Sequence, residues 1–228
     1  MSPLTPAVYE DQLARFQREQ DGRFPRIERL PCLEDATEDH SGYCPIYLLH
    51  TGWAARVLAK SKPSKHIDIS GLTYFAGIAS AIVPFEYYDF RTINIPLPGL
   101  VTGQADLTRL FFKDDQVESL SCLHVMEHVG LGRYGDPLDV RGDIKAALEL
   151  KRVLAPGGQL LIVLPVGQPK VCFNAHRIYS YEQVMDMFSG LTLREFTLVD
   201  LPSIIYNADP LRVRGISEGA GCFWFVKP

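Results

Sequence analysis

The chain has 228 residues, of which 46% are hydrophobic and 22% charged, and its formal net charge is −4. That apolar content is enough to bury one sizeable core. Proteins that bind nucleic acid usually carry a basic face, and anionic membrane surfaces attract runs of Lys and Arg, so the composition argues against both partners. The longest apolar runs, such as residues 160–166, are too short to span a bilayer.

The cysteines and the N-terminal residues indicate a cellular compartment. The five cysteines are odd in number, widely scattered and form no C-x-x-C pair. This pattern argues against a disulfide framework or a structural zinc site, and it suits a reducing compartment. The opening residues MSPLTPAVYEDQLARF lack the basic-then-apolar layout of a secretory signal. We therefore expect a soluble, cytoplasmic protein.

Residues 1–44 differ from the rest of the chain. Thr5 and Pro6 are typical of an N-cap and a first helical position, so they predict a short helix. The following segment, residues 20–44, is polar and interrupted by prolines. We expect residues 1–44 to form a peripheral or cap segment and residues 45–228 to form one α/β domain.

Helical and strand patterns alternate from Pro45 onward. Helices are predicted over residues 46–62, 74–83, 140–154 and 181–188, the last with a capping box at Ser180 and Gln183. Strands are predicted over residues 65–70, 85–90, 117–123, 159–166, 193–201 and 222–226, with a short one before Asp106. This order predicts a doubly wound, mostly parallel sheet, whose ligands lie at the carboxyl ends of the strands.

The first strand-to-helix turn reads HIDISGLTYFAG. A nucleotide-binding turn needs small residues so that backbone N–H groups can approach the ligand. Asp68, Ser70 and Gly71 meet that need in part, although the next glycine after Gly71 is Gly77 and the G-x-G-x-x-G spacing is absent. An ordinary turn between a strand and a helix is the alternative.

Two aspartates follow the next two predicted strands. Asp89 closes the second, where an acidic side chain commonly holds a ribose hydroxyl pair. Asp106 lies near the end of the third, where a carboxylate can reach an adenine amine. The alternative for each is a solvated turn or N-cap aspartate.

His124, Glu127 and His128 form an H-x-x-E-H pattern directly after the buried strand at residues 117–123. In one class of zinc protease, two such histidines bind zinc and the glutamate activates water. A divalent ion that assists another reaction is a second possibility. The third is one buried, hydrogen-bonded histidine with the others on a cleft wall.

The segment GLGRYGD, residues 130–136, has three glycines around Arg133 and Tyr134. So many glycines favour a close approach of the backbone to a ligand, or a movable lid.

The segment FNAHR, residues 173–177, follows the fifth predicted strand. We expect Asn174, His176 and Arg177 to face His124 and Glu127 across one cleft, because the ends of neighbouring parallel strands meet at one edge of the sheet.

Three elements together resemble class I S-adenosylmethionine-dependent methyltransferases. They are LHVMEHVGLGRYGDP (residues 123–137), KAALELKRVLAPGG (residues 145–158) and FNAHR. They match a poorly characterised branch that carries LH-x-x-EH-x-GLGRYGDP, K-x-L-x-x-x-x-RVLKPGG and FNAHR. The resemblance extends from about Pro45 to the last residue and implies a seven-stranded sheet of order 3-2-1-4-5-7-6. Strand 7 is antiparallel and helices cover both faces in that fold.

The resemblance also implies S-adenosylmethionine as cofactor and a role for each matching residue. The cofactor turn would hold Asp68, Ser70 and Gly71; the ribose would contact Asp89; the adenine would contact Asp106 and Leu107; the methionine part would lie beside Leu123 and His124. The turn departs from the usual D/E-x-G-x-G-x-G, because Ser70 replaces the first glycine.

We therefore expect a methyltransferase that acts on a small-molecule or glycan hydroxyl. The expected base is His128 or His176, with Glu127 orienting an imidazole and Arg177 or Arg133 holding an acidic acceptor. Tyr134 and Asn174 would belong to the lid and the acceptor site. The rival hypotheses are a non-catalytic protein that keeps the fold and binds another ligand, and a metal-assisted enzyme that uses His124, Glu127 and His128. A nicotinamide dehydrogenase fits the first turn less well.

Overall fold

The computed structural model describes residues 5–19, 29, 31, 44–91 and 93–228. The chain divides into two units, residues 1–44 and residues 45–228, and each is described by itself. In the first unit, helix α1 spans Pro6–Glu19, and the backbone N–H of Val8 donates to Oγ1 of Thr5 at 3.3 Å. The predicted N-cap is confirmed. Most of residues 20–44 lie outside the described residues, and a cap role for residues 1–44 stays a prediction.

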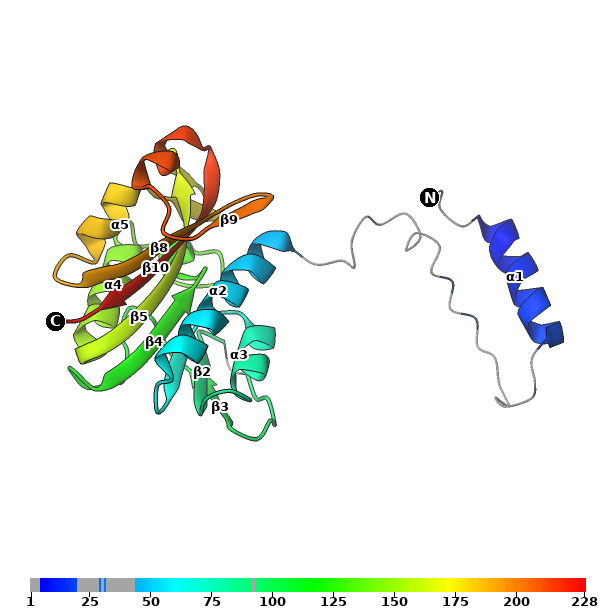
Figure 1. Cartoon of the computed structure of the whole chain (residues 1–228), viewed down its shortest axis with the longest axis horizontal. Helices are drawn as coiled ribbons and strands as arrows, with labels where there is room; N and C mark the ends of the chain where they lie inside the picture. Colours follow the sequence, from blue (N-terminus) through cyan, green and yellow to red (C-terminus); the bar gives the residue numbers. More distant parts are fainter. Residues whose placement is uncertain (1–4, 20–28, 30, 32–43, 92) are drawn as a thin grey trace. The chain divides into compact units, whose positions relative to one another are not determined.

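The second unit is built on one large sheet (Figure 1). Its strands are β1 (His66–Ile69), β2 (Phe85–Asp89), β3 (Leu100–Gln104), β4 (Val117–Leu123), β5 (Leu154–Gly167), β8 (Thr192–Asp200), β9 (Ser203–Ile205) and β10 (Glu218–Val226). In the described part of the chain this sheet has eight strands in the order β3-β2-β1-β4-β5-β10-β8-β9. The first five are parallel, and β10 is antiparallel to β5 and to β8. The predicted doubly wound sheet is confirmed, and the short edge strand β9 is an addition to the seven expected strands.

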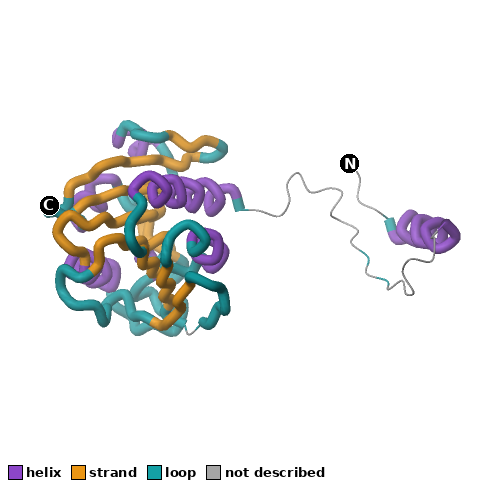
Figure 2. The backbone as a smooth tube through the Cα atoms, turned by 60° about the horizontal axis from the view of Figure 1, so that its bottom comes forward, coloured by secondary structure: helices purple, strands orange, loops and turns teal. Residues whose placement is uncertain are grey.

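Helices lie on both faces of the sheet (Figure 2). They are α2 (Pro45–Ser61), α3 (Thr73–Ala79), α4 (Gly142–Val153) and α5 (Tyr181–Met187), with 3₁₀ turns η2 (Met126–His128) and η3 (Pro210–Gly215). A separate pair of strands, β6 (Lys170–Cys172) and β7 (His176–Ile178), lies between β5 and α5 in the sequence. None of the described helices is long and apolar enough to cross a lipid bilayer.

Strand β5 shows why the sheet is covered on both sides. Leu160, Ile162 and Leu164 pack in the core that contains α4 and α5, whereas Leu161 and Val163 pack in the core that contains α2 and α3. Each fully buried side chain of this kind contributes about 1.5–3 kcal/mol. Burial on both faces accounts for the near-continuous apolar run in the sequence.

Two helix ends test the sequence patterns. The capping box at Ser180 and Gln183 is present and starts α5 as predicted. Helix α3 ends at Ala79 instead of running to residue 83. The hydroxyl of Ser80 donates to the carbonyl of Gly77 at 2.7 Å, and the backbone N–H of Ile82 donates to the carbonyl of Ala79 at 2.9 Å. These bonds tighten the chain into a turn before Pro84 is reached.

Candidate functional site

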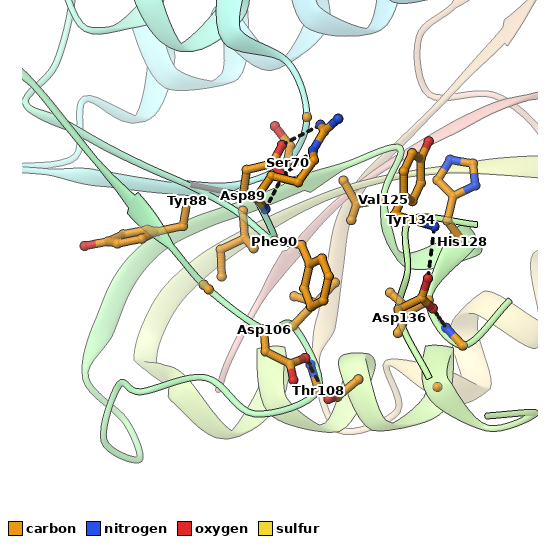
Figure 3. Close-up of a pocket in the computed structure, with 18 of the residues that line it drawn as sticks. Ser70, Tyr88, Asp89, Phe90, Asp106, Thr108, Val125, His128, Tyr134 and Asp136 are labelled. Carbon is orange, nitrogen blue, oxygen red and sulfur yellow. Dashed lines mark hydrogen bonds and ion pairs between the residues drawn. The ribbon is translucent and has the colours of Figure 1, made fainter. Parts of the chain in front are cut away.

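A cavity of about 350 Å³ lies at the carboxyl ends of the parallel strands (Figure 3). Its volume is in the range of small-molecule sites. Figure 3 shows Ser70 and Asp89 on one side and His128, Tyr134 and Asp136 on the opposite side. Of the residues predicted from the sequence, the cavity is lined by Ser70, Gly71, Asp89, Asp106, Leu107, His124, His128 and Tyr134.

The irregular cofactor turn leaves this cavity open. The hydroxyl of Ser70 donates to Oδ2 of Asp68 at 2.5 Å, so it is held against the protein. Leu72 is half-buried, the Tyr74 side chain is 89% exposed, and neither lines the cavity. Gly71 lies beside Asp89, and a Cβ added to it would stand at an ordinary contact distance of 3.9 Å from Oδ2 of that carboxylate. Leu72 and Tyr74 stand at the second and third glycine positions of the usual turn, and their side chains therefore do not fill the cavity.

A buried chain of hydrogen bonds leads from Asp68 through the centre of the sheet. Ser121 lies 2.5 Å from Oδ1 of Asp68, and Nε2 of His66 lies 2.8 Å from the Ser121 hydroxyl. On the other side of the ring, Nδ1 of His66 lies 2.7 Å from Ser119, which accepts from Nε2 of Gln159 at 2.8 Å. The sequence analysis missed this network, although polar residues within the buried strands β1, β4 and β5 were a signal.

The direction of these bonds follows from the carboxylate. An ionised Asp68 only accepts, so Ser121 donates to it and accepts from Nε2–H of His66. Nδ1 of His66 then accepts from Ser119. Burial lowers the pKa of His66 to about 3, which keeps the ring neutral. Burial also raises the pKa of Asp68 to about 6, against the hydrogen bonds from Ser121 and Ser70.

Asp89 ends β2 and already has a partner. Arg91 donates to Oδ1 from its backbone N–H at 2.8 Å and from Nε at 3.0 Å, and to Oδ2 from Nη2 at 2.9 Å. Burial would raise the pKa of Asp89, but these hydrogen bonds outweigh it and hold that pKa below its ordinary value. The carboxylate at the end of β2 is therefore on the cavity wall and is paired with an arginine.

Asp106 combines a turn role with a place on the cavity wall. Its Oδ1 accepts from the backbone N–H of Thr108 at 2.8 Å and from the Thr108 hydroxyl at 2.7 Å. This is the turn role considered as the alternative. Asp106 and Leu107 also line the cavity, and Figure 3 shows Asp106 below Phe90. One oxygen of Asp106 therefore shapes the turn while the residue stays on the cavity wall.

The H-x-x-E-H cluster is arranged by hydrogen bonds. Glu127 is buried, and its Oε1 lies 2.8 Å from Nδ1 of His124 and 3.7 Å from Nε2 of His128. Nδ1 of His128 donates to the carbonyl of Ala175 at 2.6 Å. The imidazole that Glu127 orients is therefore that of His124, whereas the backbone at Ala175 fixes His128.

These contacts do not favour the metal-assisted alternative. Among the described residues, no group of three or more His, Cys, Asp or Glu side chains is placed to hold a metal ion. His124, Glu127 and His128 are placed for hydrogen bonding instead. The described residues therefore give no support to the divalent-ion site considered from the H-x-x-E-H spacing.

The glycines of the GLGRYGD loop have a local structural reason. Gly130, Gly132 and Gly135 all have positive φ. A Cβ on Gly130 would lie 2.1 Å from the carbonyl oxygen of Asp139, in the same loop. Asp136 accepts from the backbone N–H groups of Gly130 at 2.7 Å and Tyr134 at 3.2 Å. The loop needs its glycines to close on itself, so neither a lid nor a close approach to a ligand is required to explain them.

A matched pair of substitutions separates these effects. Gly135→Ala is expected to cost about 1 kcal/mol, because φ is +83° there and nothing lies within 4 Å of the new Cβ. Gly130→Ala has nearly the same φ, +82°, and adds the overlap with Asp139, so we expect a loss of about 2–3 kcal/mol. Urea denaturation of both variants measures the difference. Equal losses would contradict the close contact at Gly130.

Contrary to expectation, Asn174, His176 and Arg177 of the FNAHR segment do not line the cavity. Arg177 is buried, and Nη1 donates to the carbonyl oxygens of Val129 at 2.7 Å and Glu127 at 3.3 Å. Its Nε lies 3.6 Å from Asp143. The guanidinium therefore anchors the GLGRYGD loop. This corrects the expectation that Arg177 faces the cleft and holds an acceptor.

The remaining predicted residues lie outside the cavity wall. Nε2 of His176 lies 3.1 Å from Oε1 of Glu218, and its ring centroid is 6.3 Å from that of His128. Arg133 is exposed and donates from Nη1 to the carbonyl of Ala175 at 3.0 Å. Residues not among the cavity lining are Asp68, Leu123, Glu127, Arg133, Asn174, His176 and Arg177. Of these, Asp68 and Glu127 still contact a lining residue through hydrogen bonds, and Asn174 is exposed.

His50 on α2 was not predicted from the sequence. It is fully buried, and its ring centroid lies 4.8 Å from that of His124. Neither ring nitrogen has a hydrogen-bond partner in the described part of the chain. Burial, and secondly the neighbouring His124, lower the pKa of His50 to about 2. Its spacing fits the apolar face of a helix, so a single histidine on that face was the only signal for it.

Comparisons with known proteins show which proteins share this fold. The model of one family, described as a Caenorhabditis protein of unknown function, DUF268, matches residues 108–199. No curated protein sequence is significantly similar to the chain. The N-methyltransferase NodS from Bradyrhizobium japonicum, solved with S-adenosyl-L-homocysteine, superposes with a TM-score of 0.55 at 15% identity, over 95% of this chain and 97% of that one. The chain has the fold of class I methyltransferases.

Two further solved structures share the fold. Phosphoethanolamine N-methyltransferase 2 from Haemonchus contortus, in complex with phosphomonomethylethanolamine and S-adenosylhomocysteine, gives a TM-score of 0.54 at 13% identity. The match covers 78% of this chain and 52% of that one. The [4+2]-cyclase SpnF also gives 0.54, at 12% identity, over 77% of this chain and 82% of that one. At such identities the likeness establishes the fold alone, and the chemistry must be argued from the site.

Proposed function

We propose that the protein is an S-adenosylmethionine-dependent methyltransferase that acts on a hydroxyl group of a small molecule or glycan. The observation that carries this proposal is the cavity at the carboxyl ends of β1, β2 and β4, with the Asp89 carboxylate on one side and His128 on the other. In open α/β sheets, this edge is where ligands bind.

The residues on the cavity wall fit the cofactor. Asp89 is a carboxylate acceptor suited to a ribose hydroxyl pair, and Gly71 beside it leaves room for a ligand. Asp106 and Leu107 would face the adenine, and Ser70 brings the charge of buried Asp68 next to the cavity. When bound, S-adenosylmethionine supplies an electrophilic methyl group on a sulfonium. The protein must then position the acceptor and remove its proton.

His128 is the base we propose. Because Nδ1 donates to the Ala175 carbonyl, a neutral ring carries its lone pair on Nε2. Burial lowers the pKa of His128, against the opposing effects of Glu127 and Ala175, so the ring is neutral at pH 7. A neutral imidazole can accept the proton of a hydroxyl group as the methyl group is transferred. His176, the other candidate, does not line the cavity.

A second function has specific support. Ser70 replaces a glycine in the cofactor turn, and the Asp89 carboxylate is already hydrogen-bonded to Arg91. The fold also occurs in SpnF, a [4+2]-cyclase. A protein that keeps this fold and cavity but binds another ligand without methyl transfer is therefore the alternative, and cofactor binding separates the two.

Calorimetry with S-adenosylhomocysteine tests the proposal. We expect micromolar binding to the wild type and a loss of about tenfold or more in Asp89→Asn, because hydrogen bonds to a charged group are worth about 1.5–3 kcal/mol. Asp186→Asn, an exposed aspartate on α5, is the matched control and should bind as the wild type does. Transfer of a tritiated methyl group to candidate acceptors then tests the reaction. Absence of both binding and transfer in the wild type would leave the non-catalytic alternative.

We place this reaction in the cytoplasm, without nucleic acid or membrane as partner. Four cysteines in the described part of the chain are free thiols, which suits a reducing compartment. The net charge of −4 gives no electrostatic reason to expect nucleic acid as a partner.

A further inference from the structure

Arg91 covers the carboxylate that the proposed cofactor would use. Three donors of this residue lie 2.8–3.0 Å from the two oxygens of Asp89. The hydroxyl of Tyr87 lies 3.3 Å from the same carboxylate. The Arg91 side chain is 64% exposed, whereas that of Asp89 is 9% exposed. The arginine can therefore move, and the aspartate is held in place.

A ribose bound to Asp89 would compete with Arg91. A carboxylate offers about four acceptor positions. Three donors of Arg91 and one of Tyr87 already use them. A pair of ribose hydroxyls can bind Asp89 only if the guanidinium gives up at least part of this contact. The Arg91 guanidinium would then lie at the cavity without its anionic partner.

A tyrosine ring and a second arginine lie near the guanidinium of Arg91. Cζ of Arg91 lies 5.6 Å from the ring centroid of Tyr134, and Cζ of Arg133 lies 5.2 Å from the same ring. Of the other carboxylates on the cavity wall, Asp139 is paired with Lys145, whereas Asp106 and Asp136 accept hydrogen bonds from Thr108 and Gly130. Both guanidinium groups lie near one tyrosine ring, and Arg133, which is exposed and donates to the Ala175 carbonyl, stands beside the cavity wall. Two arginines near each other can hold one oxyanion.

We infer that a cofactor at Asp89 releases Arg91, and that Arg91 together with Arg133 then binds a carboxylate or phosphate group on the acceptor. This inference rests on the proposed function and narrows its substrate to acidic acceptors, such as uronic acids or sugar phosphates. It also sets an order, with the cofactor first and the acceptor second. The His128 ring centroid lies 5.6 Å from that of Tyr134, so an anion held beside Tyr134 places a neighbouring hydroxyl group of the acceptor close to the proposed base.

Removing the competitor tests the first step. Arg91→Gln is expected to bind S-adenosylhomocysteine about threefold to tenfold more tightly than the wild type, because the ion pair with Asp89 no longer has to be broken. Arg212→Gln, an exposed arginine on η3, controls for the loss of one positive charge and should not change the affinity. Unchanged or weaker binding in Arg91→Gln would overturn the inference.

Inorganic phosphate tests the second step. If cofactor and anion bind together, phosphate must tighten the binding of S-adenosylhomocysteine, since such coupling is reciprocal. At constant ionic strength, we expect this effect in the wild type, a smaller one in Arg133→Gln and none in Arg91→Gln. Repeating the titration with glucuronate, glucose 6-phosphate and neutral glucose distinguishes a carboxylate from a phosphate acceptor. Equal effects of phosphate in all three proteins, or none in the wild type, would overturn the inference.

One more variant separates this inference from the proposed function. If the wild type does not bind S-adenosylhomocysteine, the cofactor assignment fails, but Asp89→Asn still frees Arg91. Phosphate alone should then bind Asp89→Asn more tightly than the wild type in calorimetry. An equal phosphate affinity of the two proteins would show that Arg91 is not an anion-binding residue.

Discussion

Replacing His128 with glutamine is expected to slow methyl transfer by about 100-fold to 10,000-fold, the usual contribution of a positioned general base. Glutamine can keep a hydrogen bond to the Ala175 carbonyl but cannot accept a proton from a hydroxyl group. The affinity for S-adenosylhomocysteine should stay close to that of the wild type, because the proposed cofactor contacts lie on the opposite side of the cavity, at Ser70 and Asp89. Single-turnover transfer of a tritiated methyl group measures the rate.

His176→Gln is the matched control for this prediction. His176 pairs with Glu218 beside His128 but does not line the cavity, so its replacement should change the rate little. The pH dependence gives a second readout. A base works in its neutral form, and burial lowers the pKa of His128, so the wild type should keep its activity below pH 6.5. Equal losses in the two variants would contradict the choice of His128.

The sheet and most of its helices could be predicted because their signals are local. The apolar run of β5 needs cover on both faces, and a sheet between two helix layers provides it. The Ser180–Gln183 capping box and the Thr5 N-cap each depend on residues three positions apart. In each pattern, the donor and the acceptor lie in the same short segment. No comparable pattern marked the early end of α3. We expected Pro84 to end this helix, but it ends at Ala79, and the Ser80 hydroxyl donates to the Gly77 carbonyl.

The site was predicted less completely, because its side chains find partners far along the chain. The positions of Asp89, Asp106 and His128 followed from where strands end. The hydrogen-bonding partners of the site residues could not be predicted in this way. His66 meets Ser119 across 53 residues, and Arg177 meets the Glu127 carbonyl across 50. The spacing of residues in the sequence places a residue at an edge of the sheet. It does not say whether the side chain points into the cavity or hydrogen-bonds to a backbone carbonyl. Arg177 is the case in which this distinction reversed the expected role.

Lowering the pH from 6.5 to 4 is expected to reduce the free energy of unfolding by about 4 kcal/mol through three buried groups. The folded-state pKa values of His50 and His66, about 2 and 3, lie far below the ordinary 6.5. Unfolding then takes up a proton at each, so stability present above pH 6.5 is lost as the pH falls, by about 3 kcal/mol per histidine. Asp68 has a pKa raised to about 6, so it opposes this loss by about 2 kcal/mol between pH 6 and pH 4. Urea denaturation at a series of pH values measures the sum.

The two histidines should respond differently to replacement, because only one has partners. His50→Leu removes an unpartnered buried ring, so stability at pH 7 should stay the same or rise by about 1 kcal/mol, and the pH dependence should fall by about one proton. His66→Leu leaves Ser119 and Ser121 without their ring partner, so it should cost about 2 kcal/mol at pH 7 while also flattening the pH dependence. Leu58→Val, a core change without a titrating group, should lower stability with the wild-type pH slope. A slope unchanged in His50→Leu would mean that His50 is protonated in the folded protein, and its contact with His124 beside the cavity would then hold a charge.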